Sequence, residues 1–416
     1  MPAPLAAVRT LALFLGLLAL AAAPLRVRAQ AAAAPKGALV IAGGALRADN
    51  AQVWQRIVEL AGGRGARIAV FPTAAGNPER SGSFLAATLA RYGAKPFVVA
   101  LAPRLAGSDP RRAADDARLA AEVAAAGGAF FSGGDQGRIT ASLRRADGSN
   151  SAVLDALWTL YRRGGVIAGT SAGAAVMSST MFHDGQAPLP TLKNGVTDGR
   201  DIAPGLGFIG DEIFVDQHLL VRGRFARMLP AMLAKRYRLG LGIDENSAAV
   251  VTRAAGKPGL LIDVIGYKGA LLLDLSQAAA DPARPGFNLA NARISYLDSG
   301  DRYDVAAGAF TPGEDKEAVD AASPAWRAPI FAADILGNTA VVDLLWKLGD
   351  SSQASATGIA FGGPDGAAPE RGFEFTFTRM ADSQAWASNR ADSYSVYRIR
   401  MDVRPMRLNQ PLYRLE

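Results

Sequence analysis

The sequence predicts an α/β protein in which a parallel sheet is covered by helices on both faces. Short runs of β-branched and aromatic residues alternate with helical patterns of about 10 to 15 residues, which is typical of βαβ units. Two of these runs are followed closely by a glycine pair, as strands are before a tight turn. Half of the 416 residues are hydrophobic and 20% are charged, which suffices for one large domain or two ordinary ones.

The alternation is clearest between residues 37 and 168. The run ALVIA ends at Gly43 and Gly44, and the next segment has apolar residues at helical spacing until Gly62 and Gly63. In chain order, the predicted strands are residues 38–42, 67–71, 96–101, 129–131 and 166–168, and the helices are residues 52–60, 83–92, 111–126 and 153–163. Ligands of such sheets bind at the carboxyl ends of the strands, so the loops after the strands should carry the chemistry.

The pattern changes after residue 246. Strands are predicted without helices between them at residues 248–252, 260–264 and 271–275, and one helix follows much later at residues 339–348. Two late strands have alternating apolar residues, which are Phe373, Phe375 and Phe377 in the first and Tyr397, Ile399, Met401 and Val403 in the second. We therefore predict an α/β domain over residues 37–290 and an α+β C-terminal extension over residues 291–416.

The N-terminus has the pattern of a secretory signal peptide. Arg9 precedes an apolar run at residues 11–23, which is shorter than the roughly 20 residues that span a bilayer. Residues 27 and 29 fit the small-residue pattern of a cleavage site, and so do residues 29 and 31. We predict a signal peptide over residues 1–29, a linker over residues 30–36 and a secreted protein, extracellular or periplasmic, with no membrane attachment after cleavage. The alternative is an uncleaved N-terminal anchor.

Composition excludes several classes of function. The chain has no cysteine, so disulfides, thiolate metal sites and cysteine nucleophiles are excluded, and with two histidines a three-histidine metal site is excluded too. Residues 1–29 carry three arginines and no acid, so their removal lowers the formal charge from +7 to +4. The remaining basic residues are interleaved with acidic ones, whereas nucleic-acid binding requires a basic stripe. We expect no nucleic-acid partner, no metal and no organic cofactor.

A candidate nucleophile follows the strand at residues 166–168. Residues 169–173 read GTSAG, so a buried strand passes through a G-x-S-x-G turn into small residues that continue as a helix, the pattern of a nucleophile elbow. Ser171 would then be exposed above the sheet, and the backbone N–H of Ala172 would point to the position of an oxyanion. The alternative is a glycine-rich packing turn with a capping serine.

A serine needs a base, and the chain offers only His183 and His218. His183 comes after a predicted helix of about two and a half turns, which would carry it ~14 Å from Ser171 into a surface loop. His218 follows the apolar run 213–215 at a strand end. His218 is therefore the expected base, although a lone histidine can also be structural.

The base needs a carboxylate that orients it. Asp244 and Glu245 are adjacent at the end of a predicted strand, so their side chains should point in opposite directions and only one can face the histidine. Asp184 and Asp216 are alternatives on local grounds. The residues themselves do not decide between these four.

Two further groups lie at predicted strand or helix ends. Gly133 and Gly134 follow the strand at residues 129–131, and Gly134 can supply a second oxyanion N–H, although an ordinary glycine turn explains the pair as well. Arginines at 222, 224 and 227 begin a helix directly after His218, where they could clamp carboxylates in bidentate fashion. A solvated basic helix start is the alternative, but cations are unfavourable at a helix N-terminus.

Four segments together resemble the cyanophycinases, serine peptidases of the dipeptidase E family. The segments are residues 131–136 (FSGGDQ), 169–174 (GTSAGA), 216–218 (DQH) followed by 222–224 (RGR), and 242–246 (GIDEN). Their order and spacing agree over residues 37 to about 275. The resemblance implies a fold similar to class I glutamine amidotransferase domains. It implies Ser171 as nucleophile, His218 as general base and Glu245 as the orienting acid. The substrate contacts it implies are Asp135, Gln136, Asp216, Gln217, Arg222, Arg224 and Arg227.

The resemblance also implies an activity. Members of the family hydrolyse cyanophycin, a poly-aspartate backbone with arginine on each side-chain carboxyl, to β-aspartyl-arginine dipeptides through an acyl-enzyme. The signal peptide and the long C-terminal extension resemble the secreted members. The alternatives are an aspartyl dipeptidase of the same family, a non-catalytic secreted binding protein and a generic esterase. The oligomeric state stays open, with a homodimer as one alternative.

Overall fold

The computed structural model describes residues 34–185, 187–253, 259–362, 370–409, 412 and 416. Residues 35–416 form one compact unit. The signal peptide predicted over residues 1–29 lies outside the described residues, as does most of the linker predicted over residues 30–36. Within the described part of the chain, no helix is both long and apolar enough to cross a membrane.

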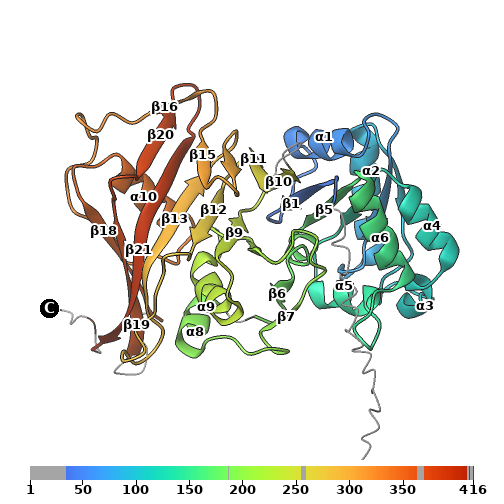
Figure 1. Ribbon diagram of the computed structural model, residues 1–416, viewed down its shortest axis with the longest axis horizontal. Coiled ribbons are helices and arrows are strands. Elements are labelled where there is room, and N and C mark those ends of the chain that lie inside the picture. The colour runs from blue at the N-terminus through green and yellow to red at the C-terminus, as the bar shows by residue number, and fades with distance from the viewer. Residues whose placement is uncertain (1–33, 186, 254–258, 363–369, 410–411, 413–415) are drawn as a thin grey trace, which may run out of the picture. The chain divides into compact units, whose positions relative to one another are not determined.

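The first sheet, which contains β1 and β5 (Figure 1), is parallel in one half only. Its order is β15-β14-β11-β10-β1-β5-β4-β2-β3, and the five strands from β1 to β3 run parallel. The strands of the parallel half are β1 (Ala38–Ala42), β2 (Arg67–Phe71), β3 (Lys95–Val98), β4 (Gly128–Phe131) and β5 (Val166–Thr170). The antiparallel half has β10 (Ser247–Arg253), β11 (Leu260–Gly266), β14 (Arg302–Asp304) and β15 (Ala309–Thr311).

The mixed α/β architecture is confirmed, and the predicted parallel sheet is parallel in the half that runs from β1 to β3. Only residues 254–259 separate β10 from β11 in the sequence, and only residues 305–308 separate β14 from β15. Connections this short leave no room for a crossover helix, and the strands pair antiparallel. The similarity to class I glutamine amidotransferase domains remains a prediction.

Helices cover both faces of the parallel half. On one face, Trp54 and Leu89 pack with strand residues such as Val40, and on the other, Leu157 packs with Leu39. The first face carries α1 (Ala51–Leu60) and α2 (Pro78–Arg91), and the second carries α3 (Pro110–Ala114), α4 (Ala117–Ala125), α5 (Gln136–Leu143) and α6 (Ala152–Arg163). This is the two-sided cover that the alternating pattern predicts.

The helix predicted over residues 111–126 is two helices, α3 and α4. The carboxylate of Asp116 accepts hydrogen bonds from the backbone N–H groups of Arg118 and Leu119, so it caps a new helix in the middle of the predicted one. Helix α5 is absent from the prediction, although Asp135 before it caps the N–H of Gly137 in the same way.

The second sheet takes strands from both sides of residue 290. Its order is β17-β18-β19-β21-β13-β12-β9-β8, with β16 and β20 attached beside β21. Its strands are β8 (Ile213–Gln217), β9 (Leu239–Ile243), β12 (Ala270–Asp274), β13 (Leu289–Leu297), β16 (Lys316–Ala318), β17 (Ile330–Ala332), β18 (Ser355–Ala360), β19 (Glu370–Thr378), β20 (Gln384–Ser388) and β21 (Tyr394–Leu408). Strand β13 spans residue 290 and pairs with β12 on one side of that residue in the sequence and with β21 on the other. That residues 291–416 form a separate extension remains a prediction.

The late strands largely follow the predicted alternation. Phe373, Phe375 and Phe377 are all buried, together with α10 (Ala340–Gly349) and α9 (Phe225–Lys235). Tyr397 is the exception in β21, because Arg398 has a φ of 59° and the register with β13 shifts there. Val396 is buried instead of Tyr397.

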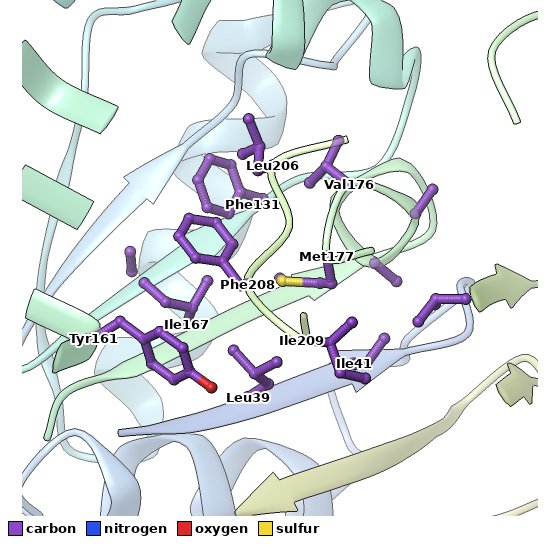
Figure 2. Packing of buried hydrophobic residues seen from close by; sticks show 14 of the residues in the cluster. Leu39, Ile41, Phe131, Tyr161, Ile167, Val176, Met177, Leu206, Phe208 and Ile209 are labelled. Carbon is purple, nitrogen blue, oxygen red and sulfur yellow. The ribbon is translucent and has the colours of Figure 1, made fainter. Parts of the chain in front are cut away.

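The two sheets share one core, and this places their strand ends side by side. Figure 2 shows Leu39 and Ile167 of the first sheet packed with Phe208, which follows the short strand β7 (Ile202–Pro204). Val215 of β8 and Leu241 of β9 belong to the same buried cluster. The ends of β1 and β5 in one sheet are thereby held against the ends of β8 and β9 in the other.

Candidate active site

Ser171 occupies a sharp turn between β5 and the one-turn helix α7 (Ala172–Ala175). Its φ is 54° and its ψ is −111°, a conformation that non-glycine residues rarely adopt. Its backbone N–H donates to the carbonyl of Ala42 at the end of β1, at 3.1 Å, so the turn is fixed to the neighbouring strand. The side chain is partly exposed at the strand end, where the sequence predicts a nucleophile.

The glycines on either side of Ser171 are required by close backbone approach. A Cβ on Gly169 would lie 2.4 Å from the carbonyl oxygen of Gly173, and a Cβ on Gly173 would lie 2.4 Å from that of Phe131. Both contacts are too short for any side chain. The G-x-S-x-G spacing is therefore a condition for this turn, and it brings β4 against α7.

His218 lies directly after β8 and contacts Ser171. Its Nε2 is 2.8 Å from the Ser171 Oγ, its φ is 50°, and the residue is 8% exposed. The backbone N–H of His218 donates to the carbonyl of Gly43 at 2.7 Å. A Cβ on Gly44 would lie 2.2 Å from the imidazole Cε1, so the glycine pair after β1 makes room for the ring.

The two adjacent carboxylates after β9 point to different partners, as the sequence predicts. Glu245 Oε1 is 2.6 Å from His218 Nδ1. Asp244 is fully buried and accepts hydrogen bonds from the backbone N–H groups of Leu220 and Val221. Asp244 therefore holds the turn that follows His218, and Glu245 holds the imidazole itself.

Two backbone N–H groups border Ser171. Gly134 has a φ of 138°, and a Cβ there would lie 2.0 Å from the Ala74 carbonyl oxygen. A Cβ on the preceding Gly133 would lie 3.7 Å from the Ser171 Oγ. Among the described residues, neither the N–H of Gly134 nor that of Ala172 has a hydrogen-bond acceptor. Both are thus available to an oxygen atom beside Ser171.

A pocket of about 320 Å³ opens over Ser171 and His218. Its lining includes the predicted oxyanion donor Gly134 and five predicted contact residues, namely Gln136, Gln217, Arg222, Arg224 and Arg227. Asp135 and Asp216 are absent from its lining. Asp135 caps α5 and forms an ion pair with Arg138, so it supports the loop next to the pocket.

Asp216 and Arg227 form a buried ion pair beneath the pocket. The Nε and Nη2 of Arg227 donate to the two carboxylate oxygens of Asp216, both at 2.7 Å. The guanidinium carbon also lies 4.0 Å from the centre of the Phe182 ring. Because the carboxylate is 1% exposed and is held by Arg227, it acts on the pocket by fixing that arginine.

Neither Arg222 nor Arg224 forms an ion pair with a carboxylate among the described residues. Arg224 Nη1 donates to the backbone carbonyl and the side-chain Oε1 of Gln217, both at 3.0 Å. Burial, and next the charge of Arg227, lowers the pKa of Arg224 to about 10. Arg222 is exposed, and no described residue forms an ion pair with it. With three arginines and one aspartate in its lining, the pocket carries more positive than negative charge, which suits an anionic group.

His183 lines the same pocket, which the sequence did not predict. The helix after Ser171 is one turn long, and the strand β6 (Thr180–Phe182) then brings the chain back toward the site. The predicted helix of about two and a half turns is wrong, because α7 ends after one turn. His183 is exposed in a loop, as predicted. The Gln136 Nε2 donates to the carbonyl oxygens of Phe182 and His183, at 2.7 and 3.2 Å, and so holds this loop.

Among the described residues, no group of three or more His, Asp or Glu side chains is arranged to hold a metal ion.

Comparison with protein families decides the classification. The model described as "Peptidase family S51" matches residues 38–254, which hold Ser171, His218 and Glu245. The chain belongs to peptidase family S51. It is a serine peptidase of that family.

Curated relatives of this S51 peptidase include cyanophycinases. The cyanophycinase of Geminocystis herdmanii (strain PCC 6308) is 33% identical over 280 residues, which cover 64% of this chain and 92% of the relative. That of Trichormus variabilis (strain ATCC 29413 / PCC 7937) is 30% identical over 280 residues, covering 65% and 86%. A peptidase crystal structure from an acI-B1 Actinobacterium has 21% identity and a TM-score of 0.45, covering 65% of this chain and 98% of its own.

The environment of His218 predicts how kcat/KM of this S51 peptidase depends on pH in the acidic range. Burial is the largest influence and lowers the pKa of His218 below its ordinary value of 6.5, while Glu245 raises it. A general base must be neutral, so kcat/KM should fall only as the pH drops below 6.5. Glu245→Gln removes the contribution of Glu245 that raises the His218 pKa, so the fall in kcat/KM should begin at a lower pH.

The chain's two histidines allow a direct measurement by NMR titration, with His183→Ala to assign the signals. Glu314→Gln is a suitable control, because Glu314 is exposed and distant in the sequence from the pocket residues. An unchanged His218 pKa in Glu245→Gln would contradict the coupling.

Proposed function

We propose that this S51 peptidase hydrolyses cyanophycin from a chain end and releases β-aspartyl-arginine dipeptides. The hydrogen-bonded series from Ser171 Oγ through His218 to Glu245, with separations of 2.8 and 2.6 Å, carries the proposal. The cationic pocket beside it and the cyanophycinases among the relatives supply the substrate class.

The proposed reaction is acyl transfer in two steps. Ser171 Oγ attacks a backbone amide carbonyl of the poly-aspartate chain, and His218 Nε2 takes the hydroxyl proton. The carbon–nitrogen bond then breaks, and His218 returns the proton to the leaving amine. Water attacks the resulting ester with His218 as base, which releases a carboxylic acid and restores the serine hydroxyl. Glu245 stabilises the imidazolium in both steps.

The negative charge that develops on the carbonyl oxygen needs donors that are already in place. In our proposal the N–H groups of Gly134 and Ala172 supply them. Their lack of acceptors among the described residues and their positions beside Ser171 support this role. Ser171 thus acts as the nucleophile of an elbow at a strand end.

The arginine cluster suits the free carboxylates of this polymer. In cyanophycin the aspartyl side-chain carboxyls are in amide linkage, so the free carboxylates along the chain are the α-carboxyls of arginine. We propose that Arg222 and Arg224 bind such a carboxylate, with Arg227 and Gln217 beside them. The lowered pKa of Arg224 supports this, because an anion would offset the mutual repulsion of the guanidiniums.

Arg222→Lys and Arg224→Lys should each lower kcat/KM by about tenfold to a hundredfold, since lysine cannot form the paired contact and a charged hydrogen bond contributes about 1.5–3 kcal/mol. Activity should also fall with added salt, because exposed charges are screened over ~10 Å at 0.1 M. Steady-state kinetics on soluble cyanophycin at several ionic strengths would measure both effects. Wild-type rates in both lysine variants would contradict carboxylate binding by Arg222 and Arg224. They would not bear on the proposed roles of Ser171 and His218.

The activity is tested by the loss of turbidity of a cyanophycin suspension, with mass spectrometry of the products. We expect dipeptides from the wild-type chain and none from Ser171→Ala. Cleavage of free aspartyl dipeptides with an intact polymer would favour the aspartyl dipeptidase alternative. Binding without cleavage would favour a non-catalytic binding protein.

We further propose that the protein is secreted after removal of residues 1–29. The arginine before a short apolar run and the small residues at 27 and 29 support this proposal. N-terminal sequencing of the exported protein should begin at Gln30, and a chain that keeps residues 1–29 in the membrane fraction would contradict it. The homodimer remains a prediction.

A further inference from the structure

Asp184 stands out among the residues that line the pocket over Ser171. It follows β6, in the loop that returns the chain to the site. Of the described residues that line the pocket, it is the only one with a carboxylate, and it faces the same space as Arg222, Arg224 and Arg227. The loop therefore gives an otherwise cationic pocket a single acidic group.

The backbone on both sides of Asp184 is held in place. The carbonyl of His183 accepts a hydrogen bond from Gln136, and its N–H donates to the carbonyl of Asp201 at 2.9 Å. The His183 ring packs so closely on α5 that a Cβ on Gly137 would lie 2.5 Å from its Cε1. A Cβ on Gly185 would likewise lie 2.6 Å from the Phe182 ring. The position of the Asp184 backbone is thus determined by its neighbours.

The carboxylate itself has no protein partner. Nearby acids are all engaged: Asp216 pairs with Arg227, Asp201 with Arg200 and Asp135 with Arg138. Asp184 is exposed, and none of the described residues donates a hydrogen bond to it or forms an ion pair with it. A free carboxylate in the lining of a pocket that also holds three arginines is available to a cation of the substrate.

We propose that Asp184 is a specificity residue that binds the guanidinium of the arginyl side chain next to the bond that is cleaved. The inference rests on the proposed cyanophycin hydrolysis. Each unit of that polymer carries both a carboxylate and a guanidinium. The arginine cluster attracts the first group but repels the second, so a zwitterionic unit requires an acidic group in the same pocket. Carboxylate and guanidinium form paired hydrogen bonds, which fits Asp184 to this role.

The test compares Asp184→Asn with the wild-type chain on two substrates. The first is cyanophycin, and the second is an otherwise identical polymer in which uncharged citrulline replaces arginine. We expect Asp184→Asn to lower kcat/KM on the arginyl polymer by about tenfold to a hundredfold and to leave the citrulline polymer unaffected. The matched control is Asp392→Asn, since Asp392 is an exposed carboxylate outside the pocket lining. Asparagine has the shape of aspartate, so the fold should persist, which thermal unfolding would check.

A second measurement separates the inference from the proposed function. Calorimetric titration of the β-aspartyl-arginine dipeptide into Ser171→Ala reports binding without catalysis, and Asp184→Asn in that background should weaken it by a similar factor. Unchanged kinetics in Asp184→Asn, or equal losses on both polymers, would overturn the role of Asp184 even if cyanophycin is cleaved. A wild-type chain that leaves cyanophycin intact would refute the proposed function. In that case the dipeptide titration still tests the role of Asp184. The role is refuted if Ser171→Ala binds the dipeptide equally well with and without Asp184→Asn, or if neither protein binds it.

Discussion

Replacement of Ser171 by alanine is expected to lower kcat for cyanophycin cleavage by about 10⁴-fold or more while the fold persists. In the proposed mechanism the hydroxyl supplies the atom that forms the acyl bond, and no other group replaces it. The turn itself depends on Gly169 and Gly173 and on the backbone bond from residue 171 to Ala42, none of which involves the side chain. Turbidity and product analysis measure the loss, and circular dichroism checks the fold.

Ser132→Ala is the matched control for this variant. Ser132 lies next to Gly133 at the end of β4, is 1% exposed, and its hydroxyl has no hydrogen-bond partner among the described residues. Its removal should leave both activity and stability nearly unchanged. If Ser171→Ala keeps more than about a tenth of wild-type activity, the nucleophile is another group.

His218→Ala is expected to lower kcat by about 10⁴-fold or more, because the serine hydroxyl then has no base. The imidazole is the group that joins Ser171 Oγ to Glu245 Oε1, with both contacts under 3 Å. Rates measured under saturating substrate would separate this effect from a change in binding.

His183→Ala provides the comparison within the same pocket. His183 lines the pocket and packs on Gly137, but its ring has no hydrogen bond to Ser171. We therefore expect kcat to stay near the wild-type value. A folded His183→Ala variant that is inactive, beside an active His218→Ala variant, would reverse the assignment of the base.

Local sequence patterns predicted the chemistry of the site because each pattern has a local physical cause. The turn around Ser171 requires glycines at 169 and 173, since side chains there would overlap backbone atoms, and the sequence records that requirement directly. The opposite directions of Asp244 and Glu245 follow from the alternation of side chains along extended chain. The search for a base is limited to two histidines by the composition of the chain alone. The choice of Glu245 over the other acids came from the family resemblance.

The sequence by itself thus determined the five parallel strands, several later strands, most helices of the parallel half and the residues that can carry acyl transfer. Only the tertiary structure decided how they meet. Ser171 comes from the first sheet and His218 and Glu245 from the second, and no local pattern encodes the shared core that joins the two sheets. The burial of Asp216 beneath Arg227 and the return of Asp184 to the pocket depend likewise on contacts between segments far apart in the chain. Such contacts are set by packing and by the early end of α7, which periodicity does not reveal.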